Sequence, residues 1–165
     1  MRIYNGKPLI NSVNGKKESM ESVFPLIQKY GGSVIALTID ESGIPDTAQG
    51  RADIAKKIVK KAAEYGIEKK DIIVDPLAMA VSSDQNSAKV TLDCVKLIRK
   101  MGVKASLGVS NISFGLPNRE IINSCFFADA LVCGLNCAIM NPFSVGMMNV
   151  YRAHRVLAGY DTACA

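Results

Sequence analysis

Short apolar runs of this sequence lead into four polar side chains whose types could bind a small planar molecule: Asn11, Asp75, Asn111 and Arg119. Asp75 is the most informative, because it stands directly before a proline at the end of the apolar run IIV. There it either shapes a turn or binds a ligand. In the second interpretation, a partly buried carboxylate accepts two parallel N–H bonds from an amidine-like edge. Such a partner would offset the high cost of burying an unpaired carboxylate.

Asn11 and Asn111 each follow an apolar run and carry an amide that can both donate and accept hydrogen bonds. As caps or turn residues they need no ligand, and both interpretations stay open. The sequence contains no G-x-S-x-G motif and no phosphate-binding P-loop, and its single histidine, His154, falls in a late helical pattern. Without a nucleophile and base pair, covalent catalysis is disfavoured and transfer between two bound partners is favoured.

Alternating strand and helix patterns must position these side chains. Strands are predicted where apolar runs are bounded by turn residues, at residues 8–13, 33–39, 71–76, 104–109 and 136–140. Helices are predicted from apolar residues at helical spacing, around 20–27, over 49–65, around 90–101, over 118–133 and over 142–157. Gly66 and Gly134 terminate the second and the fourth of these helices.

Near-continuous apolar strands that alternate with helices are typical of a parallel sheet buried on both faces. The predicted fold class is therefore α/β, either a doubly wound sheet or a (β/α) barrel. Polar residues lie at or just after the carboxyl ends of the strands, where barrel active sites are built: Asn11, Thr38 to Glu41, Asp75, Asn111 and Asn141. No G-x-G-x-x-G follows the first strand, which also favours the barrel. Because a closed barrel has eight strands, five strands indicate part of a barrel or a smaller open sheet.

Length and composition indicate one folded, water-soluble domain. The chain has 165 residues, of which 48% are hydrophobic and 21% charged, an ordinary balance for such a domain. No apolar run approaches the roughly 18 residues of a membrane span, and the N-terminus lacks the apolar segment of a secretory signal. Five cysteines without a C-x-x-C pair, together with one histidine, predict reduced thiols and no metal site. We therefore expect a cytoplasmic protein that does not associate with membranes.

The net charge of +5 raises the question of nucleic-acid binding. The densest lysines, however, alternate with Ile54, Ile58 and Val59 at helical spacing: Lys56, Lys57, Lys60 and Lys61. This pattern is typical of the solvated face of a helix. The chain also lacks tryptophan and any stripe of aromatic and basic residues, so no nucleic-acid partner is expected.

Five stretches, in this order, carry a resemblance to a known family: PLINSVNGK, ALTIDESGIPDTAQGR, IIVDPLAMAVSSDQ, LGVSNISFGLPNRE and CAIMNP. They resemble the pterin-binding (folate) domain of cobalamin-dependent methionine synthase and the related methyltetrahydrofolate:corrinoid methyltransferases. The resemblance covers essentially the whole chain. It implies a (β/α)8 TIM barrel, of which residues 1–165 form one pterin-binding domain covering about strands four to eight.

The resemblance also implies a reaction and a role for each candidate residue. The family binds 5-methyltetrahydrofolate and transfers its N5-methyl group to cob(I)alamin, which a corrinoid-binding partner domain or protein carries. By this likeness Asn11 would hydrogen-bond the pterin and Asp75 would grip its pyrimidine edge. Asn111 would be the catalytic residue beside N5, and Arg119 would help to position or stabilise the substrate.

The family's strands one to three, one of which carries another pterin-binding aspartate, should precede PLINSV and are absent from this sequence. We therefore expect the chain alone to transfer little methyl, to self-associate, or to be complemented by an N-terminal half-chain. Three alternatives stay open. One is an enzyme similar to dihydropteroate synthase, although the lysine and serine–arginine motif of that family is not found. The others are a non-catalytic module that binds pterin or a corrinoid protein, and one half of a split barrel.

Overall fold

The computed structural model describes residues 3–161. Five parallel strands form one sheet in which each strand lies beside its neighbour in the sequence. The strands are β1 (Leu9–Asn14), β2 (Ser33–Leu37), β3 (Ile72–Asp75), β4 (Lys104–Gly108) and β5 (Cys137–Ile139). The expected strand positions and their parallel pairing are confirmed.

A helix follows each strand, as the alternating pattern predicted. The α-helices are α1 (Lys17–Tyr30), α2 (Ala48–Glu64), α3 (Ser87–Lys100), α4 (Arg119–Val132) and α5 (Val145–Leu157), and two short 3-10 helices are η1 (Lys69–Asp71) and η2 (Val109–Ser113). The expected start of the last helix, Pro142, is wrong by three residues. Ser144 caps α5 instead, since its side chain accepts a hydrogen bond from Met147 N.

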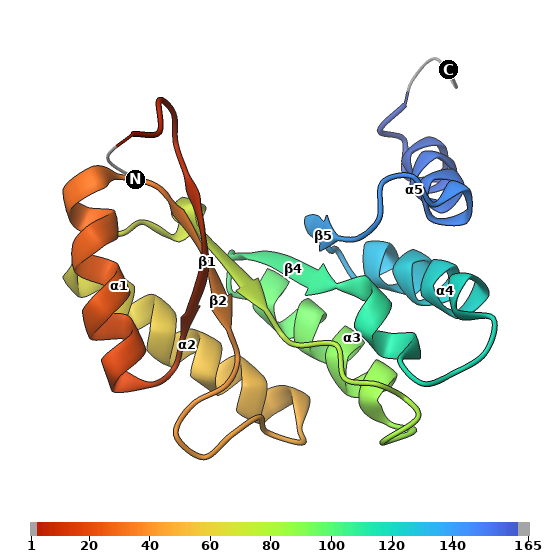
Figure 1. Ribbon diagram of the computed structural model, residues 1–165, viewed down its shortest axis with the longest axis horizontal. Coiled ribbons are helices and arrows are strands. Elements are labelled where there is room, and N and C mark those ends of the chain that lie inside the picture. Colours follow the sequence, from red (N-terminus) through yellow and green to blue (C-terminus); the bar gives the residue numbers. More distant parts are fainter. Residues whose placement is uncertain (1–2, 162–165) are drawn as a thin grey trace.

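The sheet curves into an open arc with its helices on one side (Figure 1). Helices α1 to α4 lie along the convex side, and α5 packs against α4. The concave side carries none of the helices in the described part of the chain. Doubly wound sheets have helices on both faces, whereas a barrel has all its helices outside. This one-sided arrangement therefore identifies a portion of a barrel.

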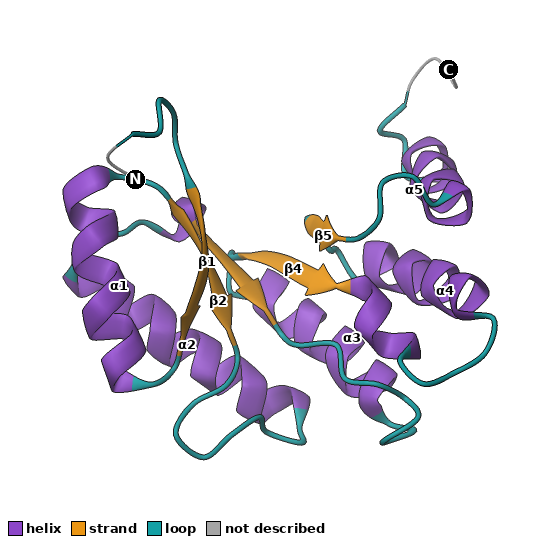
Figure 2. Ribbon diagram, in the orientation of Figure 1, coloured by secondary structure: helices purple, strands orange, loops and turns teal. Residues whose placement is uncertain are grey.

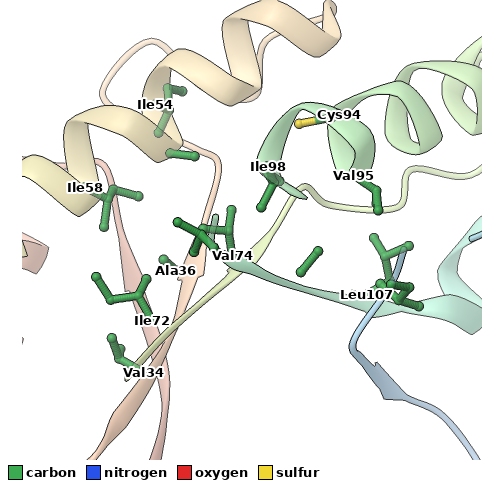
Figure 3. Packing of buried hydrophobic residues seen from close by; sticks show 14 of the residues in the cluster. Val34, Ala36, Ile54, Ile58, Ile72, Val74, Cys94, Val95, Ile98 and Leu107 are labelled. Carbon is green, nitrogen blue, oxygen red and sulfur yellow. The ribbon is translucent and has the colours of Figure 1, made fainter. Parts of the chain in front are cut away.

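Alternation along the strands decides which side chains form the core. The convex side of β2 and β3 presents four buried apolar residues to α2 and α3: Val34, Ala36, Ile72 and Val74 (Figure 3). Ile58 of α2 lies against them and is fully buried. Because successive side chains of a strand point to opposite faces, Ile35, Ile73 and Asp75 point to the concave side. The core thus fixes which residues reach the inside of the arc.

The expectation that every strand is buried on both faces holds for β3, whose four residues are all buried. It is wrong for the two outer strands. Leu9 of β1 is 53% exposed and Ile139 of β5 is 50% exposed. Each outer strand has a neighbour on one side only, and no described element covers its concave face.

An exposed, partly apolar edge strand can pair with a second copy of the chain. We expect the polypeptide of residues 1–165, taken by itself, to self-associate as its concentration rises, and Leu9→Lys to reduce that association because a charge on an edge opposes strand pairing. Leu26→Lys is the matched control, since Leu26 is 48% exposed on α1 and lies on no edge. Sedimentation velocity over a concentration series measures the result. A single mass at all concentrations for the wild-type chain would contradict the prediction.

The remaining sequence expectations concern surface and thiols. The lysines of α2 lie on its solvent side while Ile54 and Ile58 are buried, as predicted. The four cysteines between residues 3 and 161 are free, and Cys164 lies outside the described residues. None of the described helices is long and apolar enough to cross a membrane.

Candidate functional site at the strand ends

The carboxyl ends of the five parallel strands meet along one edge of the arc, because parallel strands all run in the same direction. Loops and short turns leave this edge (Figure 2). Asp75 is the last residue of β3, and Gly108 is the last residue of β4, with η2 directly after it. The polar side chains predicted from the sequence are distributed along this edge and the adjoining concave face.

Asp75 is a buried carboxylate with only 6% of its surface exposed. Its Oδ1 accepts a hydrogen bond of 2.8 Å from Leu77 N, so the predicted turn-shaping role is present. Among residues 3–161, no cationic side chain forms an ion pair with it. Since an ionised carboxylate offers about four acceptor positions, Asp75 retains capacity for donors supplied by a ligand.

Burial raises the pKa of Asp75 to about 6, against an ordinary value of 3.8. Hydrogen bonds from the backbone N–H groups of Leu77 and Gly108 act in the opposite direction and favour the charged form. The carboxylate is therefore ionised at neutral pH at an energetic cost. Donors from a ligand would relieve that cost.

This raised pKa makes folding stability depend on pH. The folded state binds the Asp75 proton more tightly than the unfolded state does. The resulting contribution to folding stability is complete below pH 3.8 and is lost as the pH rises through about 6. We expect the free energy of unfolding of the wild type, relative to Asp75→Asn, to fall by about 3 kcal/mol over this interval. Urea unfolding of both proteins at a series of pH values measures the difference. A constant difference across the series would show that Asp75 titrates normally.

Asn11 lies in the middle of β1, so the expectation that it lies at or just after the carboxyl end of the strand is wrong. The strand continues to Asn14, and its register with β2 shifts between Asn11 and Val13. Asn11 pairs with Ile35, which pairs with Ile73, two residues before Asp75 on the same strand. Asn11 and Asp75 therefore share the concave face, separated by two strand spacings, or about 10 Å across the sheet.

Asn111 lies on η2, directly beyond the end of β4, because Val109 starts a 3-10 helix rather than ending the strand as expected. The side chain is exposed and has no hydrogen-bond partner among the described residues. Its Nδ2 lies 3.1 Å from the position that a Cβ on Gly108 would occupy. Glycine at that position therefore leaves room for the amide, which is free to contact a ligand.

Arg119, at the start of α4, uses its guanidinium to hold η2. Its Nε donates to Ser113 Oγ at 3.0 Å and its Nη2 donates to the main-chain oxygen of Ser110 at 2.8 Å. It also stacks over the Phe114 ring at 6.0 Å. These contacts fix the segment that carries Asn111, so the structure gives Arg119 a positioning role within the chain.

Of the other polar residues predicted at this edge, Thr38 contacts Asp75: its N–H and its hydroxyl donate to the main-chain oxygen of Asp75 at 3.1 and 3.3 Å. The remaining three have local structural roles. Asp40 Oδ1 accepts from Ser42 N at 2.9 Å, and Asn141 Oδ1 accepts from Phe143 N at 3.0 Å, each shaping its own turn. Glu41 accepts from Lys17 N at 2.8 Å and forms an ion pair with Lys57 at 3.3 Å. They are therefore not brought together with Asp75.

Sequence reasoning missed Arg51, which is 4% exposed in the first turns of α2. Its Nε donates to the main-chain oxygen of Pro45 at 2.8 Å, and its Nη1 donates to those of Pro76 at 2.9 Å and Leu77 at 2.8 Å. Leu77 adopts a positive φ of 64°, which is unusual for a branched side chain. Arg51 thus supports the loop that follows Asp75.

Comparisons with known proteins bear on this site. The family model described as "Pterin binding enzyme" matches residues 2–141. The chain is 32% identical over 160 residues to a methylcorrinoid:tetrahydrofolate methyltransferase of Eubacterium limosum, covering 94% of this chain and 59% of that protein. It is 31% identical over 158 residues to the methionine synthase of Mycobacterium tuberculosis, covering 87% of this chain and 13% of that protein. The chain therefore spans only part of the length of either relative.

A solved structure is similar as well. The dihydropteroate synthase of Coxiella burnetii in complex with pteroic acid superposes with a TM-score of 0.72, covering 97% of this chain and 70% of the other. The sequence identity is 11%, so this likeness concerns the fold alone. It confirms the predicted barrel class, with this chain forming an open portion of five strands.

Proposed function

Because this chain belongs to the pterin-binding enzyme family, we propose that its concave face binds the pterin ring of 5-methyltetrahydrofolate for transfer of the N5-methyl group to a corrinoid. The observation that carries the proposal is Asp75, a buried carboxylate with no charged partner among the described residues, at the edge where barrel enzymes bind substrate. We further propose that residues 1–165 supply five of the eight strands of the pterin-binding domain.

The pyrimidine edge of a pterin presents two neighbouring N–H donors, which match the two oxygens of a carboxylate. Asp75 would accept from both donors, while Leu77 N keeps the carboxylate oriented. Asn11, on the same face, would supply an amide that donates or accepts at another position of the ring. Since hydrogen bonds from the pterin N–H groups favour the charged form of Asp75, pterin binding should weaken as the pH falls below about 6.

Asn111 would act at the reacting nitrogen. When the C–N5 bond breaks, its electron pair stays on N5, which then needs a proton or a hydrogen-bond donor to be an adequate leaving group. An amide serves both states, because it accepts from a protonated nitrogen and donates to an unprotonated one. Arg119 would hold η2 so that this amide is correctly placed.

The corrinoid, carried by a partner domain or protein, supplies the methyl acceptor when bound. No residue of this chain is assigned to hold it. The names of the two relatives support methyl transfer involving a corrinoid and tetrahydrofolate, or methionine synthesis. The same residues serve transfer in either direction, because forward and reverse reactions share one transition state.

The test has two parts and uses the whole protein that contains this chain. Equilibrium binding of 5-methyltetrahydrofolate by calorimetry tests recognition, and stopped-flow absorbance after mixing with cob(I)alamin tests transfer. Binding together with loss of the cob(I)alamin spectrum is expected. Binding without transfer would replace the proposal with a non-catalytic pterin-binding module. The absence of binding would overturn it.

A further inference from the structure

The contacts of Arg51 join three segments of the chain around Asp75. Its guanidinium donates to main-chain oxygens in the β2–α2 loop and in the β3–α3 loop. It also lies 3.4 Å from Thr91 Oγ1 on α3, and the Thr91 hydroxyl in turn donates to the main-chain oxygen of Leu77 at 3.2 Å. The oxygen of Leu77 therefore has two donors, which hold this residue in its positive-φ conformation.

One peptide unit connects Arg51 to the Asp75 carboxylate. The carbonyl of Pro76 and the N–H of Leu77 belong to the same planar group. Arg51 Nη1 donates to the Pro76 oxygen of this peptide at 2.9 Å. The Leu77 N–H of the same peptide donates to Asp75 Oδ1 at 2.8 Å. A rotation of the peptide would break both bonds, so Arg51 fixes the direction of the N–H that Asp75 accepts.

We propose that Arg51 is a positioning residue that aligns the Asp75 carboxylate for its ligand through the Pro76–Leu77 peptide. Arg51 belongs to α2, which lies on the convex side of the sheet, and it need not touch substrate. The identity of the ligand as a pterin rests on the function proposed above. The alignment of the carboxylate by Arg51 is independent of that function.

Electrostatics supports a role beyond packing. Arg51 is bound by neutral carbonyls and forms no ion pair within residues 3–161, so no described carboxylate lies within ion-pair distance of its guanidinium. Burial lowers its pKa, while Cys94, Asp46 and Asp84 act in the opposite direction. The charge polarises the peptide and strengthens the N–H bond to Asp75, since donors in a chain reinforce one another. No charged side chain of the described residues, Arg51 included, acts directly on Asp75, so the influence of Arg51 passes through this peptide.

Three variants distinguish alignment of the Asp75 carboxylate from general support of the fold. Arg51→Lys keeps a positive charge but loses the planar fork that reaches several carbonyls. Thr91→Val removes only the second donor to Leu77 O and leaves Arg51 intact. Ile98→Val is the matched control, because Ile98 is fully buried two turns further along α3 and its side chain has no hydrogen-bonding group.

Two measurements on the whole protein are compared at equal folded fraction. Carbon NMR of the labelled Asp75 carboxyl, without ligand, gives its titration midpoint, and calorimetry gives the affinity for 5-methyltetrahydrofolate. For Arg51→Lys we expect a midpoint at higher pH than in the wild type and an affinity loss of roughly tenfold at neutral pH. Thr91→Val should change both in the same direction but less, and Ile98→Val should change neither.

The outcomes are distinct. An unchanged midpoint in folded Arg51→Lys, or in Thr91→Val if Arg51→Lys does not fold, would overturn the positioning role. An equal midpoint change in Ile98→Val would also overturn it. A shifted midpoint in a protein that binds no pterin would leave the positioning role in place and reject the proposed function.

Discussion

Replacing Asp75 with asparagine should weaken binding of 5-methyltetrahydrofolate by more than about tenfold at neutral pH, because charge-assisted hydrogen bonds contribute about 1.5 to 3 kcal/mol. The asparagine keeps the size of the side chain but presents an N–H₂ group where a carboxylate oxygen would accept from the pterin. In the wild type the affinity should also decline below about pH 6, as the carboxyl takes up its proton. Calorimetric titrations of both proteins over a pH series measure the two effects.

Asp71→Asn provides the matched control for this change. Asp71 precedes the opposite end of β3 and forms an ion pair with Lys7, so the substitution removes the same charge far from the strand-end site. Its affinity should equal that of the wild type. If Asp75→Asn bound as tightly as Asp71→Asn, Asp75 would be a turn-shaping residue alone.

Asn111→Ala should slow methyl transfer by roughly 100-fold, the usual loss when one transition-state donor is removed. Its effect on the dissociation constant of 5-methyltetrahydrofolate should be much smaller, because the interaction with N5 strengthens only as the C–N5 bond breaks. Single-turnover absorbance of cob(I)alamin gives the rate, and calorimetry gives the dissociation constant.

The control for Asn111→Ala is Asn149→Ala, which removes an exposed amide from α5. It should leave both the rate and the affinity unchanged. A loss of affinity in Asn111→Ala equal to its loss of rate would mean that the amide binds the ground state and the transition state alike. Asn111 would then be a binding residue without a catalytic role.

The elements of this fold were predictable where one physical signal dominates. The run IIVD is apolar throughout, and it forms β3, which is buried along its whole length. Gly66 and Gly134 adopt positive φ just beyond α2 and α4, as helix-terminating glycines do. The errors arose where signals compete: Pro142 fits a helix start, but Ser144 provides the cap, and Val109 is apolar like a strand residue yet begins η2.

The candidate site was predictable only in part, for a related reason. Asp75 is recognisable because a carboxylate beside proline at the end of an apolar run is chemically unusual. Arg51 gives no such signal, since its partners are main-chain oxygens that every residue possesses. Arg119 was expected to position or stabilise the substrate, and the structure shows it holding η2. Which of these side chains meet depends on the curvature of the sheet, which a residue pattern does not encode.

The strand order has a consequence for how the molecule is assembled. Each strand of the arc pairs only with the strands immediately before and after it in the sequence, so every strand pairing joins two successive strand–helix units. Because no pairing skips a unit, β1, α1 and β2 can assemble while later residues are still being synthesised. Each new strand then pairs with a strand that is already in place. Joining the free edges of β1 and β5 through further strands would bring together the most distant parts of the sequence, and it would be the slowest step.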